Sequence, residues 1–186
     1  ASDRLVMSSG AVADPAMNAR GHTAVDVGCG PGALTSVLVD RLGTDAVAAC
    51  DPSPGFVDEC AARNPGVRVE LGRAESIPFE TGRYDHAMAQ LVLHFVSAPD
   101  AAVSEMVRVV RPHGSVSACV WDFDGGMEML RCFWDAALEN DPTAPDEAGT
   151  MRFGRSGEIA PLFTAAGLDD GIEATRRIRA AEAKSG

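Results

Sequence analysis

From residue 23 onward, short apolar runs alternate with longer stretches in which apolar positions recur every three or four residues. Runs rich in β-branched and small apolar residues predict buried strands at residues 23–27, 46–50, 67–71, 85–92 and 115–121. The helical spacing predicts helices at residues 32–42, 54–63 and 98–110. Strands and helices that alternate in this way are typical of an α/β fold. We therefore predict three layers, with a mostly parallel central sheet and helices on both faces.

After residue 121 the pattern is looser. It predicts helices at residues 126–139 and 156–166, a loop at 140–150 between them, and a strand-like piece at 172–175. Phe133 and Trp134 occupy adjacent positions of the first of these helices, and we expect them to pack in the core. Trp121 and Asp122 stand at the C-terminal end of a predicted strand, where ligands of α/β proteins bind, and are candidates for a pocket.

Composition and charge narrow the possible partners. The net charge of −11 and a single lysine, Lys184, disfavour nucleic acid, because such a site needs a basic face. No apolar run reaches the ~20 residues of a membrane span, and the N-terminus carries no basic-then-apolar leader. The five cysteines form no C-x-x-C pair, and the four histidines lack metal-ligand spacing. We expect a cytoplasmic protein of one domain, with reduced thiols, no metal and no membrane partner.

The most informative stretch is A-V-D-V-G-C-G-P-G-A at residues 24–33, where glycines separate a predicted strand from a predicted helix. Without Cβ atoms at Gly28 and Gly30, a ligand can approach the main chain closely, and the helix N-terminus suits a carboxylate or phosphate. Asp51 ends the next predicted strand, where a carboxylate can accept hydrogen bonds from ribose hydroxyls. The glycine turn and the Asp51 carboxylate together predict a nucleoside-type ligand. Gly28, Gly30 and Ala33 also satisfy the loose pattern of dinucleotide folds, so an NAD-dependent oxidoreductase is an alternative.

Five segments, in order, resemble one family. They read V-D-V-G-C-G-P-G at 25–32, C-D-P-S-P-G-F at 50–56, G-R-A-E-S-I-P-F at 72–79, Y-D-H-A-M-A-Q-L-V-L-H-F-V at 84–96 and V-R-V-V-R-P-H-G-S-V at 107–116. The chain is similar to class I S-adenosylmethionine-dependent methyltransferases, in particular to the type 11 small-molecule group. The resemblance implies a Rossmann-like fold and a transferase that uses S-adenosylmethionine (SAM) and releases S-adenosylhomocysteine (SAH). It further implies a small-molecule acceptor and a monomer or homodimer. A SAM-binding protein without catalysis is an alternative.

The resemblance also implies roles for individual residues. The loop of Gly28, Cys29, Gly30 and Gly32 would lie under the methionine part of the cofactor, with Asp26 near its amino group. Asp51 would bind the ribose, and the adenine and the methionine tail would contact the residues Pro52, Ser53, Ala74, Gln90 and Leu91.

Two positions leave alternatives open. Many relatives carry an aspartate before the adenine-binding alanine, whereas this chain has Arg73, followed after Ala74 by Glu75. Either Glu75 substitutes as the acceptor for the adenine amine, or Arg73 stacks on the ring or faces solvent. His94, four residues after Gln90, is the candidate catalytic base, because its ordinary pKa of ~6.5 suits a proton acceptor. Alternatively, His94 orients the loop that follows the fourth predicted strand.

The ends of the chain depart from the family, whose sheet closes with an antiparallel hairpin. We divide the domain into a lid or cap remnant at residues 1–22, a cofactor-binding core at 23–122 and a C-terminal part with acceptor-side helices at 123–186. We expect that lid segments near both ends are absent from this sequence, so that the intact protein exceeds 19.4 kDa.

Overall fold

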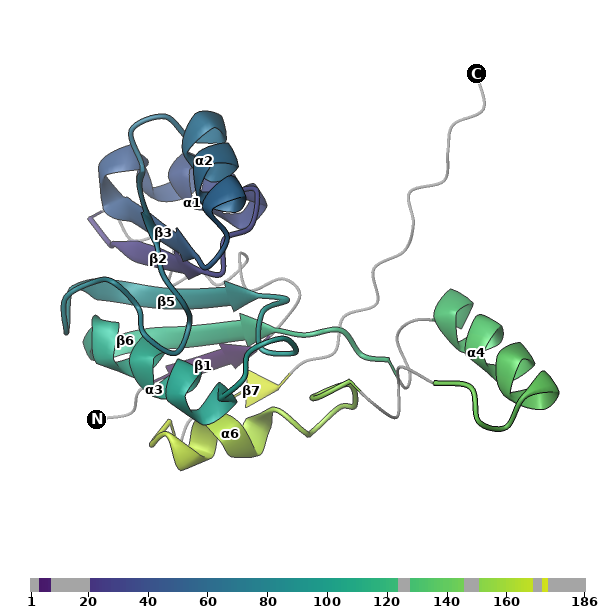
Figure 1. Ribbon diagram of the computed structural model, residues 1–186. Coiled ribbons are helices and arrows are strands. Elements are labelled where there is room, and N and C mark those ends of the chain that lie inside the picture. Colours follow the sequence, from purple (N-terminus) through teal and green to yellow (C-terminus); the bar gives the residue numbers. More distant parts are fainter. Residues whose placement is uncertain (1–3, 8–20, 124–127, 146–150, 169–171, 174–186) are drawn as a thin grey trace, which may run out of the picture.

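The computed structural model describes residues 4–7, 21–123, 128–145, 151–168 and 172–173. A single sheet of seven strands runs through the molecule in the order β4-β3-β2-β5-β6-β1-β7, and all its strand pairs are parallel (Figure 1). Its strands are β1 (Arg4–Met7), β2 (Ala24–Val27), β3 (Val47–Asp51), β4 (Arg68–Leu71), β5 (Tyr84–Gln90), β6 (Val110–Cys119) and β7 (Ile172–Glu173). The parallel sheet predicted from the sequence is confirmed.

Helices cover the sheet, as the alternating pattern predicted. They are α1 (Ala33–Leu42), α2 (Pro54–Arg63), α3 (Pro99–Val109) and α6 (Ala160–Ala165). A further helix, α4 (Glu128–Asn140), lies away from the sheet, and η3 (Thr44–Ala46) is a short 3-10 turn. In Figure 1, α1 and α2 lie together beside β2 and β3, whereas α3 lies beside β5 and β6 and α6 lies next to α3. The cofactor-binding core expected at residues 23–122 therefore contains the central strands and three of these helices.

Alternation along β2 explains why the sheet needs helices on both faces. Ala24 packs in a cluster with Leu34 and Leu38 of α1, whereas Val25 belongs to the large cluster that includes Met106 of α3. Successive side chains of a strand point to opposite faces, so a strand that is buried throughout must be covered twice. Burying each valine, leucine or methionine side chain of these clusters stabilises the fold by about 1.5–3 kcal/mol.

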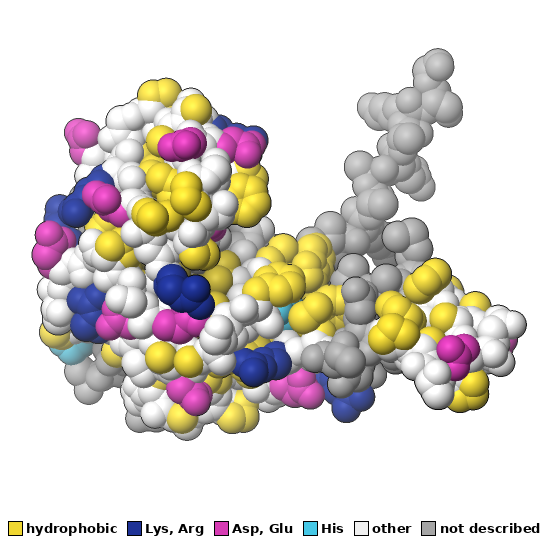
Figure 2. All heavy atoms as spheres, viewed as in Figure 1, with side chains coloured by type: hydrophobic (Ala, Val, Ile, Leu, Met, Phe, Trp, Pro, Cys, Tyr) yellow, Lys and Arg dark blue, Asp and Glu magenta, His cyan; other side chains and the backbone are white. Residues whose placement is uncertain are grey.

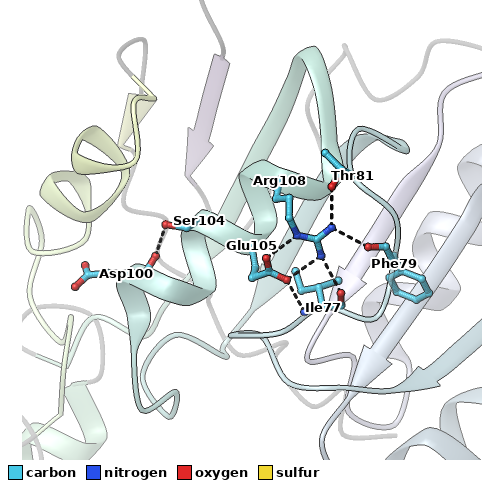
Figure 3. Close-up of polar contacts among 7 residues, drawn as sticks. All are labelled: Ile77, Phe79, Thr81, Asp100, Ser104, Glu105 and Arg108. Atoms are coloured by element: carbon cyan, nitrogen blue, oxygen red, sulfur yellow. Dashed lines mark hydrogen bonds and ion pairs between the residues drawn. The ribbon is translucent and has the colours of Figure 1, made fainter.

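A polar cluster ties α3 to the connection between β4 and β5. The Arg108 guanidinium donates to the carbonyl oxygens of Ile77 and Phe79, both at 2.9 Å, and to the Thr81 hydroxyl at 3.2 Å (Figure 3). Glu105 accepts the Ile77 N–H at 2.9 Å and pairs with Arg108. Because the connection has no regular secondary structure, these side chains supply hydrogen bonds that a sheet or helix would otherwise provide.

The outer parts of the fold differ most from the sequence predictions. β1 was not predicted, although it pairs with β6 and β7. The helix predicted at 156–166 is shorter, because Gly157 adopts a left-handed φ of 89° and α6 begins at Ala160. The prediction that Phe133 packs in the core is wrong, since its side chain is 61% exposed on α4, a helix that projects from the body (Figure 1). Hydrophobic side chains gather on α4 and on the body beside it (Figure 2).

Candidate functional site

A cavity of about 550 Å³ opens at the C-terminal ends of β2, β3 and β5. This is the edge where ligands of open parallel sheets bind, and the volume lies within the range of small-molecule sites. The structure brings together here nearly all the residues selected from the sequence. The lining includes Asp26, Gly28, Cys29, Gly30, Asp51, Pro52, Ser53, Ala74, Glu75, Gln90 and Leu91. Gly32 and His94 are absent from the lining.

The glycine turn provides room for a ligand. Gly28 has a φ of +73°, and a Cβ there would lie 2.5 Å from Val92 Cγ2. A Cβ on Gly32 would meet the side chains of Asn64 and Cys60, at 2.6 and 2.9 Å. Gly30 faces open space instead. Gly28 and Gly32 are therefore required by packing inside the protein, whereas Gly30 keeps the approach from the cavity free.

The N–H groups of this turn are used within the protein, which the sequence did not predict. Gly28 and Cys29 both donate to the Cys50 carbonyl, at 2.8 and 3.0 Å, and Gly32 donates to the Cys29 carbonyl at 3.0 Å. Gly30 N–H donates to Asp51 Oδ2 at 2.9 Å. The turn is thus held in shape before any ligand binds, and its main contribution to binding is space.

Asp51 is buried at the end of β3, with 6% of its surface exposed. Its Oδ2 accepts from Gly30, and its Oδ1 accepts the Ser53 N–H at 2.9 Å. Each carboxylate oxygen has two lone pairs, so each can accept a further hydrogen bond from a ligand hydroxyl. Two hydroxyls on neighbouring carbon atoms would satisfy this geometry.

Asp26 is the most unusual group of the site. It is 1% exposed, and its Oδ2 accepts from the Thr35 hydroxyl at 2.7 Å. Its Oδ1 is buried without a hydrogen-bond partner in the part of the chain that the structure describes. Burial raises the pKa of Asp26 to about 7, against the lowering effect of the hydrogen bonds with Thr35. An unpaired buried carboxylate that lines a cavity is suited to a cationic ligand group.

The segment after β4 contributes a buried backbone and two paired charges. Ala74 is 5% exposed. Arg73 extends into solvent with 62% of its side chain exposed and contacts Glu75 Oε2 at 3.5 Å. Glu75 Oε1 accepts the N–H groups of Ser97 and Ala98. The Glu75 carboxylate is therefore occupied by protein groups, whereas Arg73 is exposed and also lines the cavity, so that stacking on the adenine ring and facing solvent both stay open for it.

The loop after β5 forms an apolar wall. The predicted strand ends early, at Gln90, because Leu91 takes a left-handed φ of 61°. Leu91, Phe95 and Val96 line the cavity, and Phe95 is 72% exposed. The sequence analysis did not select Phe95 or Phe56, a second exposed aromatic of the lining, because nothing in the local pattern separates an exposed aromatic side chain from a core one.

His94 is buried behind this wall, outside the residues that line the cavity. Its Nδ1 lies 2.7 Å from the Arg152 carbonyl, and its Nε2 accepts the Trp121 N–H at 2.7 Å. The one lone pair of a neutral imidazole is therefore in use, and burial lowers the pKa of His94. This geometry favours the loop-orienting role over that of a base. Trp121 and Asp122 also lie outside the cavity lining.

The fold and this cavity define a class of protein, and a comparison with family models agrees. Residues 25–118, half of the chain, match the model of a methyltransferase domain of the type 11 group. The chain therefore belongs to this family, the class I SAM-dependent methyltransferases.

Relatives and a solved structure are consistent with that assignment. A protein of Mycobacterium tuberculosis named as an uncharacterized methyltransferase is 39% identical over 98 residues, which are 53% of this chain and 39% of the relative. A demethylmenaquinone methyltransferase of Beutenbergia cavernae is 38% identical over 100 residues, which are 53% of this chain and 41% of the relative. A Thermotoga maritima structure, described as a SAM-dependent methyltransferase and possible histamine N-methyltransferase, superposes with a TM-score of 0.60 at 22% identity. That superposition covers 80% of this chain and 65% of the other and supports the fold.

The matches cover about two fifths of these curated relatives, namely 39% and 41% of their lengths. Within the described residues, no helix is long and apolar enough to cross a membrane. The same residues contain no group of three or more His, Cys, Asp or Glu side chains that could hold a metal ion.

Proposed function

We propose that this chain binds SAM in the cavity and transfers its methyl group to a small-molecule acceptor. The observation that carries the proposal is the unpaired Oδ1 of Asp26 beside the bare turn at Gly28 and Gly30, with the Asp51 carboxylate at the next strand end. SAM has a cationic amino group, a ribose and an adenine. These residues fit such a molecule, because they offer a free buried carboxylate, a hydroxyl acceptor and room for close approach.

The roles of the residues follow from their contacts. Asp26 would pair with the ligand's ammonium group, and Asp51 would accept from its ribose hydroxyls while keeping the bonds to Gly30 and Ser53. Ala74 would present its backbone to the adenine. When bound, SAM supplies an electrophilic methyl group on a positively charged sulfur, so the chain mainly has to align the acceptor and exclude water.

The acceptor is proposed to be a small organic molecule with an apolar face. Phe95, Val96 and Leu91 form an exposed apolar wall of the cavity, next to the end of β5. Aromatic side chains bind flat apolar rings with favourable geometry as well as burial. The relative named for demethylmenaquinone is consistent with this class of acceptor.

Calorimetry with SAH and with NAD⁺ tests the cofactor. We expect SAH to bind and NAD⁺ not to bind. Asp51→Asn should weaken SAH binding by about 10- to 100-fold, because hydrogen bonds to a charged group contribute about 1.5–3 kcal/mol. Asp58→Asn, which removes an exposed carboxylate on α2, is the matched control and should bind like the parent. Unchanged SAH affinity in Asp51→Asn would contradict the assigned site.

A screen with methyl-labelled SAM then tests catalysis and the acceptor class. Flat apolar phenols, quinols and amines are compared with strongly polar acceptors of the same size. Transfer to the first group is expected. SAH binding without transfer to any acceptor would instead support the alternative of a binding protein without catalysis.

A further inference from the structure

Glu75 joins the two segments that form one side of the cavity. Its own segment, residues 73–75, follows β4, and the loop at residues 91–98 follows β5; both contribute to the cavity lining. The Glu75 Oε1 accepts the Ser97 N–H at 2.9 Å and the Ala98 N–H at 3.4 Å. The side chain is 15% exposed, and its other oxygen faces Arg73. One carboxylate thus connects the segment assigned to the adenine with the loop that carries the apolar wall.

The start of α3 needs an acceptor that its own sequence does not supply. The residue that caps the helix is Ala98, which has no polar side chain, and the next residue, Pro99, has no N–H group. A carboxylate at this end of a helix is also favoured by the helix dipole. Burial alone would raise the pKa of Glu75, but hydrogen bonds from backbone N–H groups, including those of Ser97 and Ala98, and the charge of Arg73 bring it below its ordinary value.

The rest of the loop is held from its other side. The Arg152 guanidinium donates to the carbonyl oxygens of Val96 and Ser97, at 3.2 and 3.3 Å. His94 connects the loop to the Arg152 carbonyl and to the Trp121 N–H. Arg152 therefore holds acceptor groups of the turn at residues 96–98, whereas Glu75 holds its donor groups.

We propose that Glu75 is a positioning residue, which fixes the apolar wall at residues 91–98 against the segment that holds the adenine. The inference rests on the proposed function, because it assumes that the ligand of the cavity is SAM or SAH. Glu75 acts through the backbone of both segments and keeps the cavity in its binding shape before the ligand arrives.

Paired substitutions separate positioning from simple stabilisation. Glu75→Ala is compared with Glu105→Ala, because Glu105 also joins α3 to the β4–β5 connection, through Ile77 and away from the cavity lining (Figure 3). SAH affinity is measured by calorimetry and the midpoint of unfolding by circular dichroism. Glu75→Ala should bind SAH about tenfold more weakly than the parent, equivalent to ~1.4 kcal/mol. Glu105→Ala should lower the unfolding midpoint but bind SAH like the parent.

Conservative variants complete the test. Glu75→Gln keeps an oxygen that can accept from Ser97 and Ala98, so its SAH affinity should recover to within about threefold of the parent. The SAH affinity of Glu105→Gln should equal that of the parent. If Glu75→Ala does not fold, Glu75→Leu takes its place, because it keeps an apolar side chain of similar length but offers no acceptor to the Ser97 and Ala98 N–H groups, and it should bind SAH about tenfold more weakly than the parent. Parent-like SAH binding by Glu75→Ala, or equal weakening in the Glu105 variants, overturns the positioning role. Absence of SAH binding by the parent overturns the proposed function itself.

Discussion

Replacing Asp26 by Asn should stabilise the protein while weakening its binding of SAH. Burial raises the pKa of Asp26 from 3.8 to about 7 in the folded protein. Between these two values the unfolded chain has lost a proton that the folded protein still holds. Stability therefore falls as the pH rises from 3.8 to about 7, and the full penalty is present above that window. Asn carries no charge, so the penalty disappears in the variant.

The size of the effect follows from the two pKa values. A pKa that is about 3 higher in the folded protein corresponds to a loss of about 4 kcal/mol in the free energy of unfolding once Asp26 is ionised. About 2 kcal/mol of this loss falls between pH 5.5 and pH 7. Asp26 also lines the cavity, where water can solvate the charge and reduce the burial penalty. We therefore expect Asp26→Asn to gain about 1 kcal/mol on the parent over that pH interval.

Urea unfolding of the parent and of Asp26→Asn, at several pH values from 5.5 to 8.5, measures this difference. Other titrating groups, including His94, are present in both proteins and cancel. Asp40→Asn removes an exposed carboxylate of α1 and should show no comparable change. Calorimetry at pH 8 should show SAH binding at least about tenfold weaker in Asp26→Asn, because the ammonium group loses its charged partner. Parallel stability curves for Asp26→Asn and the parent would refute the assigned titration.

Two further substitutions test packing and the loop. Gly28→Ala should cost about 1–3 kcal/mol of unfolding free energy, because the residue has a φ of +73° and its Cβ would overlap Val92. Gly30→Ala should cost less, because a Cβ there meets no atom within 4 Å. Equal losses of unfolding free energy in urea for the two variants would contradict this account. His94→Gln should lose about 1–3 kcal/mol at pH 7.5, because two backbone groups lose their partner. The folded-state pKa of His94 is lowered, so the stability advantage of the parent over His94→Gln should shrink as the pH falls below ~6.5; a difference between the two proteins that stays constant with pH would count against that assignment.

Parts of the fold that depend on burial alone could be predicted from the sequence. β2 and β3 are buried along their whole length, and a strand covered on both faces must read as an apolar run. α2 was predicted with its observed bounds, because Pro54 can begin a helix and residues 64–66 cannot continue one. The strand at β6 was predicted too late, since Pro112 and Gly114 resemble a turn although the strand already begins at Val110.

Contacts between distant segments could not be predicted in this way. The glycine turn and Asp51 are local features, and the sequence placed both at the cavity. The bonds from Ser97 and Ala98 to Glu75 join positions more than twenty residues apart, and a single sequence carries no signal for such a pair. The same holds for His94 and Trp121, so a titratable residue near the cavity resembled a base although its ring nitrogens bind backbone.

The hydrogen bonds of the site indicate where a ligand contributes most. The turn's N–H groups, both oxygens of Asp51 and the carboxylate of Glu75 all have protein partners, so these groups are in place before binding. Asp26 Oδ1 differs, because within the described residues it has no such partner. A cationic ligand group would therefore relieve a cost that the free protein carries, and binding energy is largest where it removes an existing penalty. Ligand affinity and the instability of the free protein thus have the same origin in one carboxylate.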